Sequence, residues 1–200
     1  MKRNDTVKMM IERQSCRKFL DKRIDLETID EILLAGTYAP NAGGAQPWSI
    51  TCIVRRELLD KIGDLMEEDL RQHMPGFDPA NMVEHHGTRG AILFGKGFAP
   101  MLVVISEKPG EQTPVVASAL CAENMIIAAE SYGISSCWLG AVTANLIAPI
   151  LADPNGDPEI KRLVPEGYRL IGVLAFGYPA EGGFRTPRVP RRGGNVTILA

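Results

Sequence analysis

Three polar side chains that can hold a phosphate stand close together in the stretch "RQSCR". Arg13, Ser15 and Arg17 place two guanidinium groups and a hydroxyl within five residues, where a helical pattern ends. Planar, forked guanidinium donors match phosphate oxygens, so the stretch is a candidate phosphate clamp. The alternative is a solvated basic turn, which so short a motif favours when it is taken alone.

A second basic group lies near the C-terminus and consists of Arg185, Arg188, Arg191 and Arg192. These side chains either meet an anion or keep a tail soluble. The chain has neither G-x-G-x-x-G after a strand nor a G-x-x-x-x-G-K-[ST] loop. A bound nucleotide would therefore have its phosphate held by arginines.

Two further stretches suggest contact with a ligand through the backbone. "APNAGGAQPW", residues 39–48, combines small residues with Pro40 and Pro47. The small residues let a ligand approach the backbone closely, and the two prolines fix the path of the chain. "GISSCWLG", residues 133–140, is expected to be a turn whose amides suit a planar ring such as a flavin. Its alternative is a helix-to-strand turn with a core tryptophan.

Other chemistry has less support. His73, His85 and His86 lack the spacing of metal ligands, so no metal site is predicted. Cys16 lies between two arginines that could acidify its thiol. With no resolving cysteine near it in the sequence, we expect a passive thiol.

The hydrophobic periodicity predicts helices interleaved with short strands. We expect helices from Asn4 or Asp5 to the break in "RQSCRKF", from 25 to before Pro40, and over 58–74, 113–131 and 144–151, and strands over 48–54, 99–106, 168–179 and 195–200. This order indicates an α+β or α/β fold with one sheet, and residues 1–200 are expected to form one domain.

Composition argues against several partners. With 200 residues and a net charge of −2, the chain has no general attraction to nucleic acid or to an anionic membrane. No apolar run reaches the roughly 18 residues of a membrane span, and the start lacks the apolar stretch of a signal peptide. Four widely spaced cysteines fit a reducing compartment. We expect a cytoplasmic protein.

The helix expected over residues 113–131 needs cover on nearly every side. Its stretch "VVASALCAENMIIAAE" contains only two charges. Dimerisation is the simplest way to bury the apolar surface of this helix. The closing "NVTILA" reads as a strand without an obvious partner, and could add to the sheet of a second subunit.

Taken in order, "ERQSCRKF", "APNAGGAQPW", "GISSCWLGA", "AFGYP" and the arginine-rich tail resemble the FMN-dependent nitroreductase family. The resemblance implies an α+β homodimer with a mostly antiparallel central sheet flanked by helices. The subunits of this family exchange C-terminal segments, here about residues 180–200, and build two FMN sites at their interface.

The resemblance also implies which residues bind FMN. Those expected at the phosphate and ribityl chain are Arg13, Gln14, Ser15 and Arg17, joined by one tail arginine, with Arg191 first, Arg192 second and Arg188 third. Those expected beside the ring of the partner subunit's flavin are Pro40, Asn41, Ala42 and Gly44. Those expected on the other side of the ring are Cys137, Trp138, Leu139 and Gly140, with the last two amides pointing toward N5 or O4. Arg89 or Lys96 could add a contact.

The loop departs from the family pattern at two positions. The family commonly has serine at Asn41 and asparagine at Gly44. Without that asparagine side chain, a backbone amide, Gln46 or a water replaces the donor, or flavin reduction is tuned differently.

The implied activity is electron transfer from NADH or NADPH through flavin N5 to a nitroaromatic, quinone or similar small acceptor, with no catalytic side chain. Two alternatives stay open. One is a specialised flavin reaction such as dehalogenation, flavin fragmentation or heterocycle oxidation, and the other is a non-catalytic flavin sensor or store. The acceptor pocket is expected to come from the segment between Arg71 and Gly97.

Overall fold

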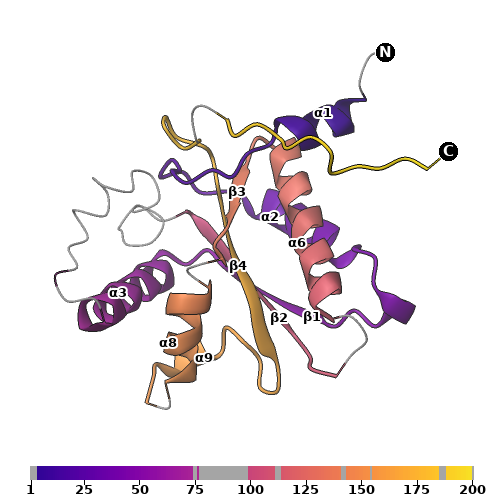
Figure 1. Ribbon diagram of the computed structural model, residues 1–200. Helices are drawn as coiled ribbons and strands as arrows, with labels where there is room; N and C mark the ends of the chain where they lie inside the picture. Colours follow the sequence, from indigo (N-terminus) through magenta and orange to yellow (C-terminus); the bar gives the residue numbers. More distant parts are fainter. Residues whose placement is uncertain are drawn as a thin grey trace.

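Figure 1 shows the computed structural model, which describes residues 4–73, 76, 99–110, 114–140, 143–153, 155–184 and 188–199. The helical elements are α1 (Asp5–Glu12), α2 (Leu26–Thr37), the 3-10 turn η1 (Ala42–Gly44), α3 (Arg56–His73), α6 (Pro114–Ser131), the π-helical turn η2 (Thr143–Ile147), α8 (Ala148–Ala152) and α9 (Pro158–Lys161). The strands are β1 (Trp48–Ile53), β2 (Met101–Glu107), β3 (Ser135–Trp138) and β4 (Arg169–Gly177).

The four strands form one antiparallel sheet in the order β1-β2-β4-β3. Val103 of β2 lies opposite Leu174 of β4, and Cys137 of β3 lies opposite Ala175. All seven residues of β2 are buried. A central strand covered on both faces reads as an uninterrupted apolar run, which is how "APMLVVIS" reads.

Helices cover both faces of the sheet (Figure 1). On one face, Ile32 of α2 and Met125 of α6 pack with Phe176 of β4 in one apolar core. On the other face, Met66 of α3 and Ile160 of α9 belong to a second core. Because α6 lies against the sheet and against α2, part of its apolar surface is buried within the chain.

The helix starts follow the expected capping chemistry. The Asn4 side chain accepts a hydrogen bond from the Thr6 amide at 2.9 Å, and Asp25 accepts one from the Thr28 amide at 2.8 Å. A side-chain oxygen at this position satisfies an amide that the helix itself leaves unpaired.

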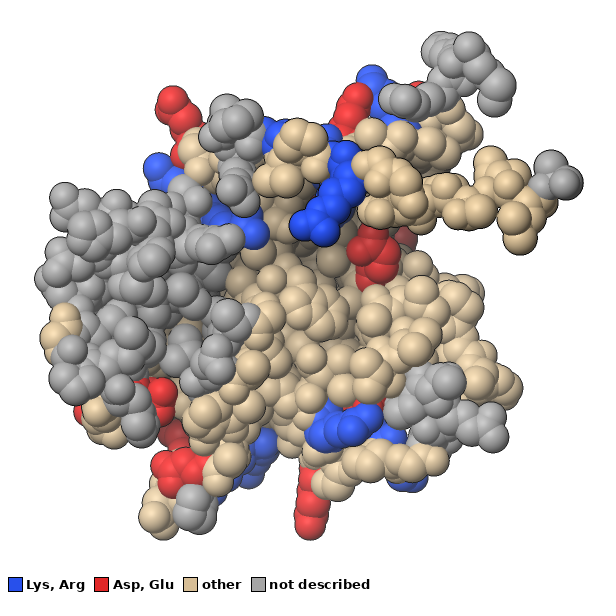
Figure 2. Space-filling model, in the orientation of Figure 1, with Lys and Arg blue, Asp and Glu red and all other residues tan. Residues whose placement is uncertain are grey.

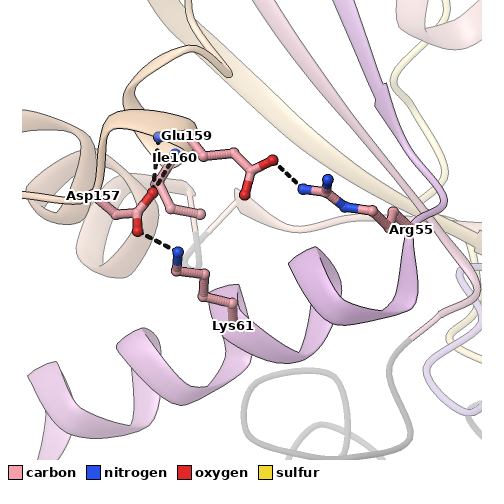
Figure 3. A network of polar contacts seen from close by, with 5 residues as sticks. All are labelled: Arg55, Lys61, Asp157, Glu159 and Ile160. Atoms are coloured by element: carbon pink, nitrogen blue, oxygen red, sulfur yellow. Dashed lines mark hydrogen bonds and ion pairs between the residues drawn. The ribbon is translucent and has the colours of Figure 1, made fainter.

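On the second face, two ion pairs join α3 to α9 (Figure 3): Arg55 with Glu159 and Lys61 with Asp157.

The helices and inner strands lie where the sequence predicts them, and one expectation is wrong. Residues 135–138 form the edge strand β3, not a turn, because they pair with β4. Residues 195–199 form no strand within this chain, and the side chains of Ile198 and Leu199 are exposed. Their addition to the sheet of a second subunit stays a prediction.

Within the described ranges, no helix combines the length and the apolar character needed to cross a membrane.

Candidate functional site

The segment that follows α1 lies along the open edge of β3. The Cys16 amide donates to the Ser136 carbonyl at 2.9 Å, and the Leu20 amide donates to the Tyr178 carbonyl at 2.8 Å. Ser136 belongs to β3, and Tyr178 follows β4. These bonds bring the "RQSCR" stretch beside "GISSCWLG", residues 133–140, which is called the Cys-Trp stretch below. More than 100 residues separate the two stretches in the sequence.

The C-terminal tail returns over the same segment. The Arg17 amide donates to the Gly183 carbonyl at 2.7 Å. Farther along, the Arg188 guanidinium donates to the carbonyls of Ile11 and Arg13, the latter at 3.0 Å. The two basic groups at opposite ends of the sequence therefore meet.

An open pocket of about 270 Å³ lies at this meeting point. Its lining residues are Arg13, Gln14, Ser15, Arg17, Arg188, Val189 and Arg191. The blue side chains in the upper part of Figure 2 gather where the tail passes the end of α1. None of the four lining arginines has a carboxylate within 4.0 Å among the described residues.

The tail arginines differ in where they lie relative to the pocket. Arg191, the first choice from the sequence, lines the pocket, and Arg188, the third choice, both lines it and anchors the tail. Arg192 is exposed and is not part of the lining. Arg185 lies outside the described residues.

The thiol of Cys16 is buried behind the pocket. Burial is the main cause that raises its pKa, and the nearby Cys137 thiol adds to the rise. A raised pKa reduces the thiolate fraction, which favours the passive thiol expected from the sequence. The closeness of Cys137 was not visible from the sequence, because it depends on the pairing of the Cys16 segment with β3.

Glu130, at the end of α6, is a further residue that the sequence did not single out. One of its carboxylate oxygens, Oε2, is buried and has no hydrogen-bond partner among the described residues. Burial raises the pKa of this carboxyl, and the charge of Arg13 opposes the rise. Glu130 therefore lies close enough to act on an arginine of the pocket.

The Cys-Trp stretch presents side chains and backbone differently from the expectation. Trp138 is 37 % exposed, so it is not a core tryptophan. Its ring packs against Gly172 of β4, where a Cβ atom would lie 2.4 Å from the ring. The Leu139 amide donates to the Val173 carbonyl at 2.8 Å. That bond corrects the expectation that this amide points toward a flavin, and leaves the Gly140 amide as the candidate.

The loop "APNAGGAQPW" is held together by its own asparagine. Asn41 Nδ2 donates to the Ala39 carbonyl at 3.1 Å, and Asn41 Oδ1 accepts from the Gln46 amide at 2.9 Å. Gly44 has a φ of 73°, in the left-handed region that glycine and asparagine tolerate best. Both glycine here and the asparagine common in the family suit this backbone.

Within one chain, this loop and the basic pocket are far apart. The Lys108 amide donates to the Pro47 carbonyl at 3.0 Å, which ties the loop to the turn before α6 begins. The pocket lies near Glu130, where α6 ends. Figure 1 shows the two regions at opposite ends of α6. One chain alone does not place Pro40, Asn41, Ala42 or Gly44 at the pocket.

Some sequence expectations fall outside the described residues. Arg89, Lys96, His85 and His86 lie there, as does nearly all of the expected acceptor segment. Where the structure does describe the chain, no group of three or more His, Cys, Asp or Glu residues could hold a metal ion.

Comparisons with known proteins agree on one family. The model described as the nitroreductase family matches residues 10–178. A crystal structure of a nitroreductase with bound FMN from Bacteroides fragilis has a TM-score of 0.74 and 25 % identity, covering 99 % of this chain and 100 % of that one. An FMN reductase (NADPH) of Bacillus subtilis is 26 % identical over 195 residues, covering 94 % of this chain and 72 % of its own. An iodotyrosine deiodinase of Haliscomenobacter hydrossis is 27 % identical over 180 residues, covering 86 % of this chain and 78 % of its own.

These matches confirm the expected architecture, an antiparallel sheet flanked by helices on both faces. The family match runs from α1 through β4 and so includes the "RQSCR" segment, the loop and the Cys-Trp strand. The chain belongs to the nitroreductase family.

Proposed function

We propose that the protein binds FMN in the basic pocket and acts as an oxidoreductase, taking electrons from NADH or NADPH and delivering them to a nitroaromatic, quinone or similar small acceptor. The observation that carries this proposal is the meeting of four guanidinium groups around one pocket whose lining contains no carboxylate among the described residues. Family membership and the FMN bound by the Bacteroides relative support the same cofactor.

The chemistry of the lining fits the phosphate of FMN. A phosphate monoester carries about −1.5 to −2 charges near neutral pH and three strong acceptor oxygens. Arg13, Arg17 and Arg191 offer forked donors to these oxygens, and Ser15 adds a hydroxyl. Because none of these arginines has a carboxylate within 4.0 Å among the described residues, they favour an anionic ligand.

The remaining residues would orient the cofactor. Arg188 holds the tail against the carbonyls of Ile11 and Arg13, which keeps Arg191 at the pocket. The flavin ring would lie along Cys137–Gly140, where the Trp138 ring is fixed by its packing on Gly172. When bound, FMN would supply the redox chemistry, so no side chain need act as nucleophile or general base.

A second copy of the chain would complete the site. Val115, Val116 and Leu120 in the first half of α6 are 50 %, 58 % and 38 % exposed, and α1, which packs against α6, exposes Met10 and Ile11. Figure 2 shows a broad area with few charged side chains below the basic pocket. Apolar surface of this kind favours association. A homodimer would cover it and could bring the partner's loop to the pocket.

A specialised flavin reaction is the second candidate. The similarity to an iodotyrosine deiodinase favours reductive dehalogenation as its form. The loop also departs from the family at Asn41 and Gly44. In this case the cofactor and its binding residues stay the same, and only the acceptor differs.

The test is an anaerobic absorbance titration of the full-length protein loaded with FMN. We expect NADH or NADPH to bleach the flavin, and a nitroaromatic or quinone to restore its colour. Restoration by a halogenated tyrosine alone would favour the second candidate. Failure of both nicotinamides to bleach bound flavin would favour a sensor or store. A protein that takes up no FMN would contradict the proposal.

A further inference from the structure

Glu107, at the end of β2, is a charged side chain that the proposed function does not use. It is 0 % exposed, and among the described residues no other charged side chain is buried. A buried carboxylate is costly unless it is paired, and a buried ion pair seldom stabilises a protein more than apolar side chains of the same size would. The presence of Glu107 in the core therefore points to a role other than stability.

The two carboxylate oxygens of Glu107 join β2 to β4 and to α6. Two nitrogens of the Arg169 guanidinium, at the start of β4, contact Oε1. The Ser118 hydroxyl of α6 donates a long hydrogen bond to Oε2, at 3.5 Å. Both oxygens are engaged, so the side chain fixes the end of β2 against its neighbours.

The loop "APNAGGAQPW" is attached to the sheet at the same place. Trp48, the last residue of the loop and the first of β1, lies opposite Glu107 in the β1–β2 register. The Lys108 amide donates to the Pro47 carbonyl at 3.0 Å. On its other side, Glu107 lies opposite Arg169 of β4. The C-terminal end of the loop is therefore held by Glu107 and the residue after it.

Backbone pairing alone holds this end of the sheet incompletely. The β2–β4 register shifts between Ile105 and Ser106, and only the pairs of Ser106 and Glu107 lie beyond the shift. An irregularity of this kind interrupts the ladder of backbone hydrogen bonds locally. The contact between Glu107 and Arg169 joins the last pair beyond the interruption. Side chains thus replace part of the backbone pairing that is lost.

The loop itself is stiff, so its orientation depends on where it is attached. Asn41 closes the loop through its bonds to the Ala39 carbonyl and the Gln46 amide. Gln46 has a φ of 46°, in the left-handed region that glutamine rarely adopts. Such a conformation persists only where the surrounding structure holds it. A loop of this kind would turn as a unit if its end at Trp48 moved.

We propose that Glu107 is a positioning residue for the loop: by binding Arg169, it fixes the ends of β1 and β2 from which the loop projects. Without this contact the loop would keep its internal bonds and lose its fixed orientation. The inference rests on the proposed function in one step, the placement of the loop against the flavin bound by a second copy of the chain. Because the loop would meet the ring and not the phosphate, Glu107 would affect FMN and riboflavin alike.

Hydrogen exchange and flavin binding, both measured on the full chain, test this inference. Glu107→Gln keeps the size of the side chain and removes its charge. In this variant the Lys108 amide should exchange at least about tenfold faster than in the wild type, and the Val103 amide, in the middle of β2, should change much less. Quenching of flavin fluorescence should show FMN and riboflavin bound more weakly by the same factor, about three- to tenfold.

Glu159→Gln is the matched control, since it makes the same substitution in an ion pair with an arginine on another part of the molecule. It should leave both readouts as in the wild type. Arg169→Lys keeps the charge without the forked donors, so it should show the effects of Glu107→Gln to a smaller extent. If Glu107→Gln fails to fold, Arg169→Lys decides the inference by the same two readouts.

Unchanged exchange at the Lys108 amide would overturn the inference, and so would an equal rise at the Lys108 and Val103 amides or an unchanged affinity for both flavins. A loss confined to FMN would also overturn it, because the effect would then lie at the phosphate. In each of these cases the wild type still binds flavin, and the proposed function stands. A wild type that binds neither flavin contradicts the proposed function and this inference with it.

Discussion

Two pockets of similar size, on different parts of the molecule, differ in whether their cationic side chains are paired with carboxylates. The pocket between α3 and α9 has a volume of about 370 Å³ and is lined by Arg55, Glu57, Leu58, Lys61 and Glu159. Both cations of its lining are paired (Figure 3): Arg55 with Glu159, and Lys61 with Asp157. Asp157 also accepts the amides of Glu159 and Ile160, at 2.8 and 3.3 Å.

The basic pocket, of about 270 Å³, has four arginines in its lining and no carboxylate among the described residues there. Volume does not separate these two pockets, but charge pairing does. Paired charges near α9 join two helices and need no ligand. Clustered cations without acids repel one another, so their arrangement favours an anion that binds between them.

The largest effect is expected from removing a cation of the basic pocket. Arg13→Ala should weaken FMN binding by about 1.5–3 kcal/mol, because it removes a charge-assisted contact with the phosphate. Quenching of flavin fluorescence on binding measures this change. Lys61→Ala, in the paired pocket, is the control and should leave FMN affinity unchanged. Equal losses in both variants would erase the distinction between the pockets.

A smaller difference should separate the two tail arginines. Arg191→Ala should weaken FMN binding without changing the tail, because Arg191 lines the pocket and, among the described residues, has no hydrogen bond of the kind that Arg188 makes. Arg188→Ala should also speed amide hydrogen exchange in residues 188–199, since it loses the bonds to the Ile11 and Arg13 carbonyls. Unchanged exchange in Arg188→Ala would show that these bonds do not hold the tail.

The thiols should be slow to react, including the one behind the basic pocket. Burial raises the pKa of Cys52 to about 11 and that of Cys121 to about 12, and it raises the pKa of Cys16 as well. Near pH 8 these thiols should resist alkylation in the folded protein and react in denaturant. Mass spectrometry reads out each site. Rapid labelling of Cys16 alone would show that the wall of the pocket opens.

The smallest effect concerns the paired pocket. The ion pair with Lys61 is the main cause that lowers the pKa of Asp157, and its bonds to two helix amides help. A carboxyl whose pKa is lowered by folding stabilises the protein above about pH 4, and this stability is lost as the pH falls. Asp157→Asn should therefore lower the Tm by a few degrees at pH 7 and by less near pH 3. FMN affinity should not change.

Local signals in the sequence predicted the elements well. Asn4 and Asp25 cap helices as expected, and the apolar run of β2 identified the buried strand. These signals depend on neighbours along the chain. The stretch that contains β3 was expected to be a turn, because a strand of four residues carries too little pattern to reveal itself in the sequence.

Contacts between distant segments could not be read in the same way. Both basic groups were found, but the bond from Arg188 to the Arg13 carbonyl spans 175 residues. Glu130 looked like one of two charges in an apolar helix, and only the packing of α1 on α6 places it by Arg13. The Leu139 amide was misjudged because its partner, Val173, lies on another strand.

The most direct measurement of the central claim is a comparison of FMN with riboflavin, which has the same ring without the phosphate. If the unpaired arginines bind the phosphate, the wild type should bind FMN at least about tenfold more tightly, and the double variant Arg13→Ala/Arg17→Ala should lose most of that preference. Equal affinity of the wild type for the two flavins would contradict the claim.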